Sequence, residues 1–276
     1  MNCFQLIKSV LDEAYEQIPG NEAERDFKIN DMLSALRNDY SNLLRGAEIG
    51  YRDPLIRFAY IYAYVTSHAN LVYSTIQDNE NLGNIFDRER VNVACIGGGP
   101  GSDFLGILKY LLVNQKSPFV RFDICDKERA WAESWHDVDA KVDAPFRIST
   151  SYLSLDVTKP DDWKTYQRYF QSDVFTMIYF MSEVYTCRDL ADEYFNNLFS
   201  QAKLDSFFLF IDNNSPNFYD WFDELALANN INILEKGEDR MRIPFDEDKT
   251  DLEIYFEKFS SPKLTANIAY RIGQKR

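Results

Sequence analysis

The sequence has few of the side chains that bind transition metals. Among its 276 residues are two histidines and four cysteines. The cysteines (Cys3, Cys95, Cys125 and Cys187) are far apart and form no Cys-x-x-Cys pair. Because zinc sites need clusters of such residues, we expect no metal site. Scattered cysteines also fit a reducing compartment better than a disulfide framework.

Basic residues are also scarce. The sequence has 30 lysines and arginines against 44 aspartates and glutamates, a formal net charge of −14. Contacts to phosphate dominate nucleic-acid affinity, so this charge disfavours a nucleic-acid partner. The basic residues within 271–276 are interpreted as a solvated tail.

Long apolar runs are absent as well. No segment approaches the roughly 18 consecutive apolar residues of a membrane span. The first residues carry Asp12, Glu13 and Glu16 among apolar side chains, unlike the basic start and apolar run of a secretory signal. We therefore expect a cytoplasmic protein with no membrane partner.

The N-terminal third predicts helices. Apolar side chains recur at helical spacing over 4–11, and a second helix is expected over 22–44. The third helix has the clearest start, with Asp53 as its N-cap and Pro54 in its first turn, and it extends to residue 76. This region is expected to form an all-α domain.

From residue 91 onward the pattern alternates between strands and helices. Strands are expected at 91–96, 119–124, 147–155, 173–181 and 206–212, with further strands or hairpins in 231–243 and 252–272. Helices are expected at 103–113, 126–136, 160–170, 188–202 and 216–229. The alternation predicts an α/β fold with a doubly wound parallel sheet. We therefore divide the chain into an N-terminal helical cap, 1–90, and a sheet domain, 91–276, with residues 79–90 as the linker.

A glycine-rich turn follows the first expected strand. Its residues are Gly97, Gly98, Gly99, Pro100 and Gly101, and a helical pattern begins directly after them. Glycine permits positive φ and removes the side chain that would keep the backbone away from a ligand. The turn is therefore the expected binding place of a nucleoside-type cofactor.

Acidic residues follow the next two expected strands in a fixed order. Asp123 lies about twenty residues after the glycines, in Val-Arg-Phe-Asp-Ile-Cys-Asp, and Asp156 lies in Leu-Ser-Leu-Asp-Val. Together with the glycine turn, this set resembles the class I S-adenosylmethionine-dependent methyltransferases over roughly residues 91–276. The resemblance implies a seven-stranded Rossmann-like sheet with an antiparallel last strand, and S-adenosylmethionine as the cofactor. The N-terminal helices resemble the cap that many of these enzymes carry.

The resemblance assigns cofactor-binding roles near the glycine turn. The family's glycine positions are filled by Gly97, Gly99 and Gly101, with Gly98 between them. Cys95 stands where the family usually has an acidic residue, and Asp103 is the candidate to replace it.

The resemblance also assigns residues that bind the ribose and the adenine ring of the cofactor. Asp123 is expected to accept both ribose hydroxyls, because a carboxylate can accept two charge-assisted hydrogen bonds. Asp126 is the alternative, although it can also cap the following helix. Asp156 is expected near the adenine amine and Val157 against the ring, while a cap tyrosine, Tyr60, covers the cofactor.

The residues after the fourth strand are where cofactor and acceptor meet in this family. Ser182 is therefore assigned to the cofactor, and Glu183, Asp212 and Tyr64 are the candidate catalytic residues. An acidic pocket made by Glu183 and Asp212 would suit a cationic amine. Each of these residues also has a structural interpretation, as a turn or helix-capping carboxylate or, for the tyrosines, as core packing.

Methyl transfer from a sulfonium mainly requires that two reactants be positioned and water excluded. The Asn/Asp-Pro-Pro-aromatic motif of enzymes that methylate nucleic-acid amines is missing, and Ser182–Tyr185 stands in its place. We therefore expect a methyltransferase with a small-molecule or protein acceptor. The alternatives are a non-catalytic S-adenosylmethionine sensor or scaffold and an RNA methyltransferase. A nicotinamide or flavin dehydrogenase is disfavoured, because the glycines follow Gly-x-Gly-x-Gly.

Overall fold

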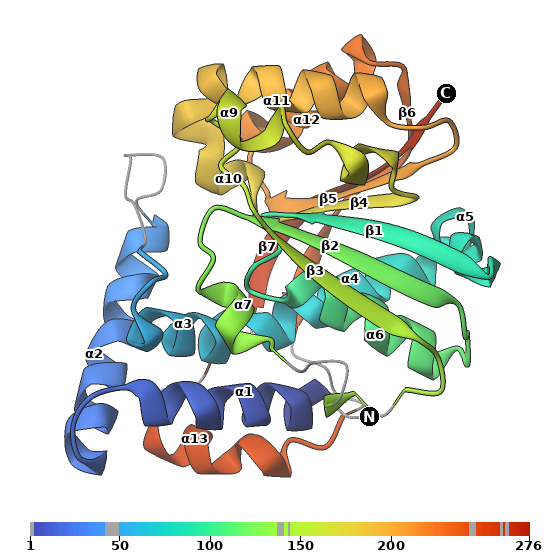
Figure 1. The fold of residues 1–276 in the computed structure, drawn as a ribbon. Helices are drawn as coiled ribbons and strands as arrows, with labels where there is room; N and C mark the ends of the chain where they lie inside the picture. Colours follow the sequence, from blue (N-terminus) through green and yellow to red (C-terminus); the bar gives the residue numbers. More distant parts are fainter. Residues whose placement is uncertain are drawn as a thin grey trace.

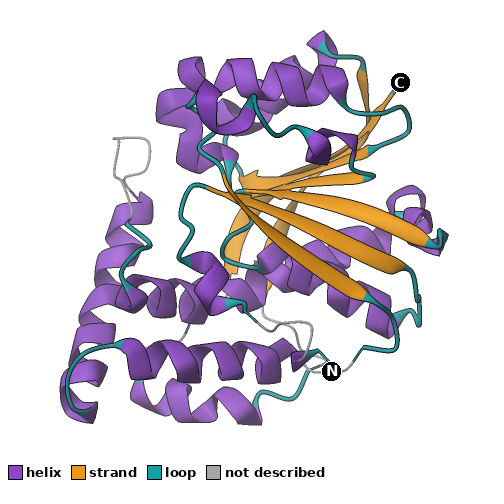
Figure 2. Ribbon diagram, viewed as in Figure 1, coloured by secondary structure: helices purple, strands orange, loops and turns teal. Residues whose placement is uncertain are grey.

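Seven strands form one sheet with helices on both faces (Figures 1 and 2). The computed structural model describes residues 3–41, 50–136, 141–142, 144–242, 247–259, 262 and 265–276. The strands are β1 (Arg90–Ile96), β2 (Phe119–Asp126), β3 (Ile148–Ser154), β4 (Val174–Ile178), β5 (Phe207–Asn213), β6 (Ile231–Arg242) and β7 (Thr265–Lys275).

The strand order is β3-β2-β1-β4-β5-β7-β6. The first five strands are parallel, and β7 runs antiparallel to β5 and β6. This arrangement confirms the expected seven-stranded Rossmann-like sheet of the class I methyltransferase type. The order reverses between β1 and β4, and ligands of open α/β sheets bind outside the carboxyl ends of the strands at such a switch point.

Two hydrophobic cores lie on the two faces of the sheet. Because side chains alternate along a strand, Val93 and Cys95 of β1 join one core and Ala94 and Ile96 join the other. The first face carries α6 (Ser102–Val113) and α4 (Thr66–Asp78), and the second carries α9 (Pro160–Trp163), α11 (Arg188–Gln201) and α12 (Pro216–Ala228) (Figure 1).

The N-terminal helices are α1 (Cys3–Gln17), α2 (Glu22–Ser41) and α3 (Pro54–Tyr60). The Asp53 carboxylate accepts the N–H of Leu55 at 2.9 Å, which confirms the predicted cap. The predicted third helix continues through a π-helical turn, η2 (Ile61–Val65), into α4. The expected end of the second helix falls in 42–49, outside the described residues. The proposed division at residue 90 stays a prediction.

Several expected elements differ in the structure. The expected linker at 79–90 contains α5 (Glu80–Gly83) and η3 (Asn84–Asp87) before β1 begins. Residues 126–136 and 160–170 form only the short helices α7 (Trp131–Ser134) and α9, with η4 (Arg168–Gln171). The fourth strand ends at Ile178 and is followed by α10 (Met181–Val184) and η5 (Tyr185–Cys187). Residues 271–275 are not a solvated tail but the end of β7, where Arg271 forms an ion pair with Asp223 at 2.9 Å.

Part of the expected strand region at 252–272 is helical. The connection between β6 and β7 contains η6 (Thr250–Leu252) and α13 (Glu253–Lys258), and α13 lies along α1 in Figure 1. Tyr255 donates its hydroxyl to Asp12 of α1, and its ring packs edge-on against Phe58 at 5.4 Å. These contacts to residues distant in sequence stabilise a helix that local patterning does not predict.

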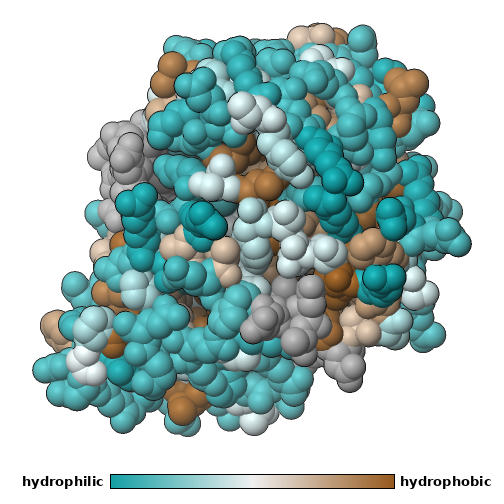
Figure 3. Space-filling model, in the orientation of Figure 1, coloured by the Kyte–Doolittle hydropathy of each residue, from teal (hydrophilic) through white to brown (hydrophobic). Residues whose placement is uncertain are grey.

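The surface seen in Figure 3 is mostly hydrophilic, with hydrophobic residues in small separate areas. Within the described ranges, no helix is both long and apolar enough to cross a membrane.

A buried ion pair lies where α1, α4, α6 and the connection between β6 and β7 meet. Lys109 of α6 lies 2.7 Å from Glu247, with the two side chains 5% and 10% exposed. The Lys109 ammonium also donates to Asn70 of α4 at 3.2 Å, and Glu247 accepts the backbone N–H of Cys3 at 2.7 Å. Four distant segments therefore meet at one pair of charges.

We expect Lys109→Met to lower the free energy of unfolding by about 3 kcal/mol, because it leaves Glu247 buried without its cation. Urea unfolding measures the change. The double variant Lys109→Met/Glu247→Gln should recover part of the loss, since no uncompensated charge remains. A single variant as stable as the wild type would contradict this account.

Candidate functional site

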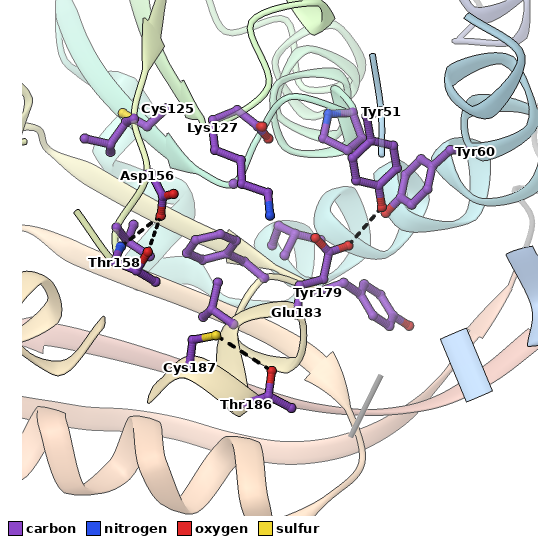
Figure 4. A pocket seen from close by; sticks show the side chains of 18 residues that line it. Tyr51, Tyr60, Cys125, Lys127, Asp156, Thr158, Tyr179, Glu183, Thr186 and Cys187 are labelled. Carbon is purple, nitrogen blue, oxygen red and sulfur yellow. Dashed lines mark hydrogen bonds between the residues drawn. The ribbon is translucent and has the colours of Figure 1, made fainter. Parts of the chain in front are cut away.

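A cavity of about 320 Å³ lies at the carboxyl ends of β1, β2, β3 and β4 (Figure 4). This volume is within the range of small-molecule sites, at its lower end. The lining residues come from the glycine turn, the ends of β2 and β4, the segments after β2, β3 and β4, and the region of α3. They are Tyr51, Tyr60, Gly97, Pro100, Cys125, Asp126, Lys127, Leu155, Asp156, Val157, Thr158, Ile178, Tyr179, Phe180, Glu183, Val184, Thr186 and Cys187.

The glycine turn connects β1 to α6 with left-handed backbone conformations. Gly97 has φ +70° and Gly101 has φ +92°, values that residues with a Cβ rarely adopt. The N–H of Gly97 donates to the carbonyl of Cys125 at 2.8 Å, which joins the turn to the neighbouring strand β2.

The glycines also let the chain pack closely against its own side chains. A Cβ on Gly97 would lie 2.1 Å from the ring of Phe180, and one on Gly99 would lie 2.2 Å from Trp131. A Cβ on Gly101 would meet Trp135 at 2.5 Å. Of the turn, Gly97 and Pro100 line the cavity, whereas Gly98, Gly99 and Gly101 are outside the lining.

Asp126 is the carboxylate at the tip of β2, and it lines the cavity. One of its oxygens accepts the N–H of Gly99 at 3.1 Å and the other accepts the N–H of Glu128 at 2.8 Å. Burial raises the pKa of Asp126 to about 6, against the opposing effects of these N–H groups and of the Lys127 charge. The backbone therefore holds this carboxylate at the cavity wall.

Asp123, the first choice for the ribose, lies outside the lining. Its side chain is 3% exposed and accepts a hydrogen bond from Arg121 at 2.9 Å. The strand β2 continues to Asp126, two residues beyond its predicted end at 124, so Asp123 is not at the strand tip.

The turn after β3 supplies Asp156 and Val157, both in the lining. The Asp156 carboxylate accepts the N–H of Thr158 at 3.0 Å and its hydroxyl at 2.6 Å, and it lies 3.0 Å from the Lys159 ammonium. Burial raises the pKa of Asp156, but these partners lower it overall. Its carboxylate is thus engaged within its own turn, and Leu155 and Val157 supply apolar wall.

Tyr51 and Tyr60, from the N-terminal helical region, line the cavity on the side opposite Asp156 (Figure 4). The Tyr51 hydroxyl donates to Glu183 at 3.3 Å, as Figure 4 shows. The Tyr51 ring meets Tyr60 edge-on at 5.5 Å and packs against Trp131 at 5.1 Å. Tyr60, which we expected at the cofactor, and Glu183, which we expected at the acceptor, both line the cavity; Tyr51 was not predicted.

A buried arginine holds Tyr51 in place. Arg57 is 3% exposed, and its Nη1 donates to the carbonyls of Tyr51 at 2.9 Å and Arg52 at 2.8 Å. Arg57 is in α3, the helix that Asp53 caps, so the start of this helix and the position of Tyr51 depend on the same few residues.

Tyr64 lies behind the cavity rather than in its lining. It is 3% exposed, and burial raises its pKa to about 12. Its ring stacks on His68 at 5.7 Å, and His68 stacks on Tyr179 at 4.0 Å with an interplanar angle of 12°. Tyr179, which lines the cavity, has φ +55°, an uncommon conformation for a residue with a side chain. The stack therefore supports a strained segment directly after β4.

Asp212 and Ser182 also lie outside the lining. Asp212 is fully buried and accepts the N–H groups of Ser182 at 2.9 Å and Asn213 at 2.7 Å. Burial raises its pKa to about 6. Asp212 thus holds the start of α10 through the backbone of Ser182. It does not join Glu183 in an acidic pocket, because Glu183 lines the cavity and Asp212 does not.

Asp103 is buried beneath the glycine turn, outside the lining. It is 2% exposed and accepts the hydroxyl of Thr176 at 2.5 Å. Burial raises its pKa to about 6. The residue lies close enough to Cys95 to raise the pKa of that thiol, although burial is the larger cause.

The lining residues absent from our expectations come mostly from two sources. Lys127 directly follows Asp126, and Tyr179 and Phe180 directly follow β4. Positioning them required the true ends of β2 and β4. No group of three or more metal-binding side chains occurs in the part of the chain that the structure describes.

No family model and no curated protein sequence matches the chain. Several solved methyltransferase structures are similar to it. A candidate RNA methyltransferase from Pyrococcus horikoshii is 15% identical, with 75% of this chain and 83% of that chain covered and a TM-score of 0.45. The 16S rRNA methylase ArmA is 12% identical, with 88% of this chain and 98% of that chain covered and a TM-score of 0.45. Precorrin-6y C5,15-methyltransferase from Geobacter metallireducens is 10% identical, with 71% of this chain and 85% of that chain covered and a TM-score of 0.41. The fold assignment rests on the strand order itself.

We expect Gly97→Ala to lower the free energy of unfolding by about 2 kcal/mol or more, from the positive φ and the clash with Phe180. Gly50→Ala is the matched control: nothing lies within 4 Å of a Cβ there, and its φ is not in the positive range. Urea unfolding of both variants tests this. Equal urea midpoints for Gly97→Ala and Gly50→Ala would show that the turn is not packed as described.

Proposed function

We propose that this protein binds S-adenosylmethionine in the cavity and transfers its methyl group to a small-molecule or protein acceptor. The observation that carries the proposal is the cavity at the β1–β4 switch point, bounded by the glycine turn and by Asp126 at the tip of β2. This is the position at which Rossmann-like sheets bind nucleoside cofactors.

The residues present fit the adenosine part of such a cofactor. Asp126 accepts one backbone N–H on each oxygen, and each oxygen keeps a further lone pair for a ribose hydroxyl. The apolar wall formed by Leu155, Val157 and Ile178 suits the flat adenine ring. We therefore assign the ribose to Asp126 rather than to Asp123.

S-adenosylmethionine supplies a methyl group on a positively charged sulfonium. The rings of Tyr51, Tyr60 and Phe180 line the cavity and present aromatic surface that attracts a cation. Catalysis of this kind relies mainly on orientation, so it needs no strong base for every acceptor.

The charges around the cavity disfavour a nucleic-acid acceptor. The lining contains the carboxylates Asp126, Asp156 and Glu183 against one ammonium, Lys127. The whole chain carries a formal charge of −14. A phosphate backbone would be repelled at this site, whereas a neutral or cationic acceptor would not.

We expect the wild type to bind S-adenosylmethionine in calorimetry and Asp126→Asn to weaken binding by about 10-fold or more, because charge-assisted hydrogen bonds are lost. Asp123→Asn is the matched control and should change the dissociation constant by less than about threefold, since it touches no ligand. A larger effect at Asp123 than at Asp126 would contradict the ribose assignment. A wild type that binds no donor would contradict the proposed function.

Affinity should also depend on pH. Burial raises the pKa of Asp126 to about 6 in the free protein, and the ribose hydroxyls can donate to both oxygens only when the carboxylate is ionised. Binding should therefore be tightest above pH 7 and weaken, by up to about tenfold per pH unit, as the pH falls below 6. In Asp126→Asn this part of the pH dependence should disappear. Identical profiles for wild type and variant would contradict the role of Asp126.

A further inference from the structure

One side of the cavity is aromatic, and the other is polar. Figure 4 shows Tyr51, Tyr60 and Tyr179 on one side of Glu183, and Asp156 with Thr158 on the other. Aromatic faces attract cations, more strongly where water is excluded. Tyr51 and Tyr60 are 6% and 3% exposed, so this side is largely shielded from solvent.

Glu183 supplies the negative charge of the aromatic side. It accepts the Tyr51 hydroxyl at 3.3 Å, and Tyr51 is in turn held by Arg57 at 2.9 Å. A carboxylate facing aromatic rings is a suitable site for an ammonium group.

We infer that the methyl acceptor is a small amine that enters as an ammonium ion beside Glu183; this inference rests on the proposed function. The acceptor is small because the buried rings of Tyr51 and Tyr60 close the space beside Glu183. The aromatic rings and the carboxylate favour a cation over a neutral alcohol or an anion.

The reaction balances with Glu183 as the proton acceptor. The ammonium gives one proton to the Glu183 carboxylate, which frees the nitrogen lone pair. The nitrogen then forms a bond to the methyl carbon while the carbon–sulfur bond breaks, and that electron pair stays on sulfur. The products are a methylated ammonium ion, a neutral thioether and a protonated Glu183, which returns its proton to solvent.

The test uses the full chain, donor labelled in its methyl group, and a small-molecule extract of the cells that produce the protein. Labelled products are identified by mass spectrometry as methylated on nitrogen, oxygen, sulfur or carbon. The expected result is transfer to an amine nitrogen. Glu183→Gln should slow this transfer by about 100-fold or more, the usual contribution of a general base. Calorimetry on the same variant should still show donor binding, which demonstrates that the variant is folded and that the donor site is intact.

Two further variants sharpen the test. Glu183→Asp keeps the base, so it should retain a measurable rate and show its acid limb at a different pH, whereas Glu183→Gln should lack that limb. Glu193→Gln, at a surface carboxylate of α11 that is half exposed and paired with Lys164, is the matched control and should transfer at the wild-type rate.

The amine inference is overturned if the label goes to oxygen, sulfur or carbon, or if no acceptor is labelled while the donor binds normally. It is also overturned if Glu183→Gln keeps more than about half of the wild-type rate, since a general base contributes far more. Failure of the wild type to bind the donor is a different result, because it overturns the proposed function itself.

Discussion

The close packing of the glycine turn against its neighbours is the constraint on which the site depends. With no Cβ at Gly97 or Gly99, the ring of Phe180 and the carboxylate of Asp126 approach the backbone directly, and the N–H of Gly99 binds that carboxylate at 3.1 Å. The turn thereby holds the ends of β1, β2 and β4 around one cavity. The glycines serve the internal fit of the protein at least as much as access for a ligand.

The cap and the sheet are coupled through one long helical element. Its C-terminal part, α4, packs on the same face of the sheet as α6, and its N-terminal part carries Tyr60 and the buried Arg57 that holds Tyr51. The π-helical turn between them lies in the tyrosine-rich segment at 61–65. A substitution in this element should therefore change both the stability of the fold and the positions of Tyr51 and Tyr60 at the cavity. The connection between β6 and β7 adds α13 to the same helical layer, beside α1.

The sequence alone predicts the sheet, the glycine turn and the Asp53–Pro54 helix start, because these depend on local periodicity and on residues with strong backbone preferences. It does not distinguish Asp123 from Asp126, since that choice depends on whether β2 ends at 124 or 126. It places Asp212 at an acceptor pocket, whereas the structure buries this side chain within β5, where it accepts the N–H groups of Ser182 and Asn213. It misses α13 and Tyr51, because both are positioned by contacts with distant segments: Asp12 and Phe58 for the helix, and Glu183 and Trp131 for the tyrosine.

The central claim is that the cavity beside the glycine turn is where an adenosine-bearing methyl donor binds. The most direct measurement is a crystal structure of the full chain grown with S-adenosylmethionine. The account predicts the donor inside the cavity, with both ribose hydroxyls in hydrogen-bond contact with the Asp126 carboxylate and its methyl group facing Tyr51, Tyr60 and Glu183. A cavity that holds only solvent at saturating donor, or a donor bound elsewhere on the protein, would contradict it.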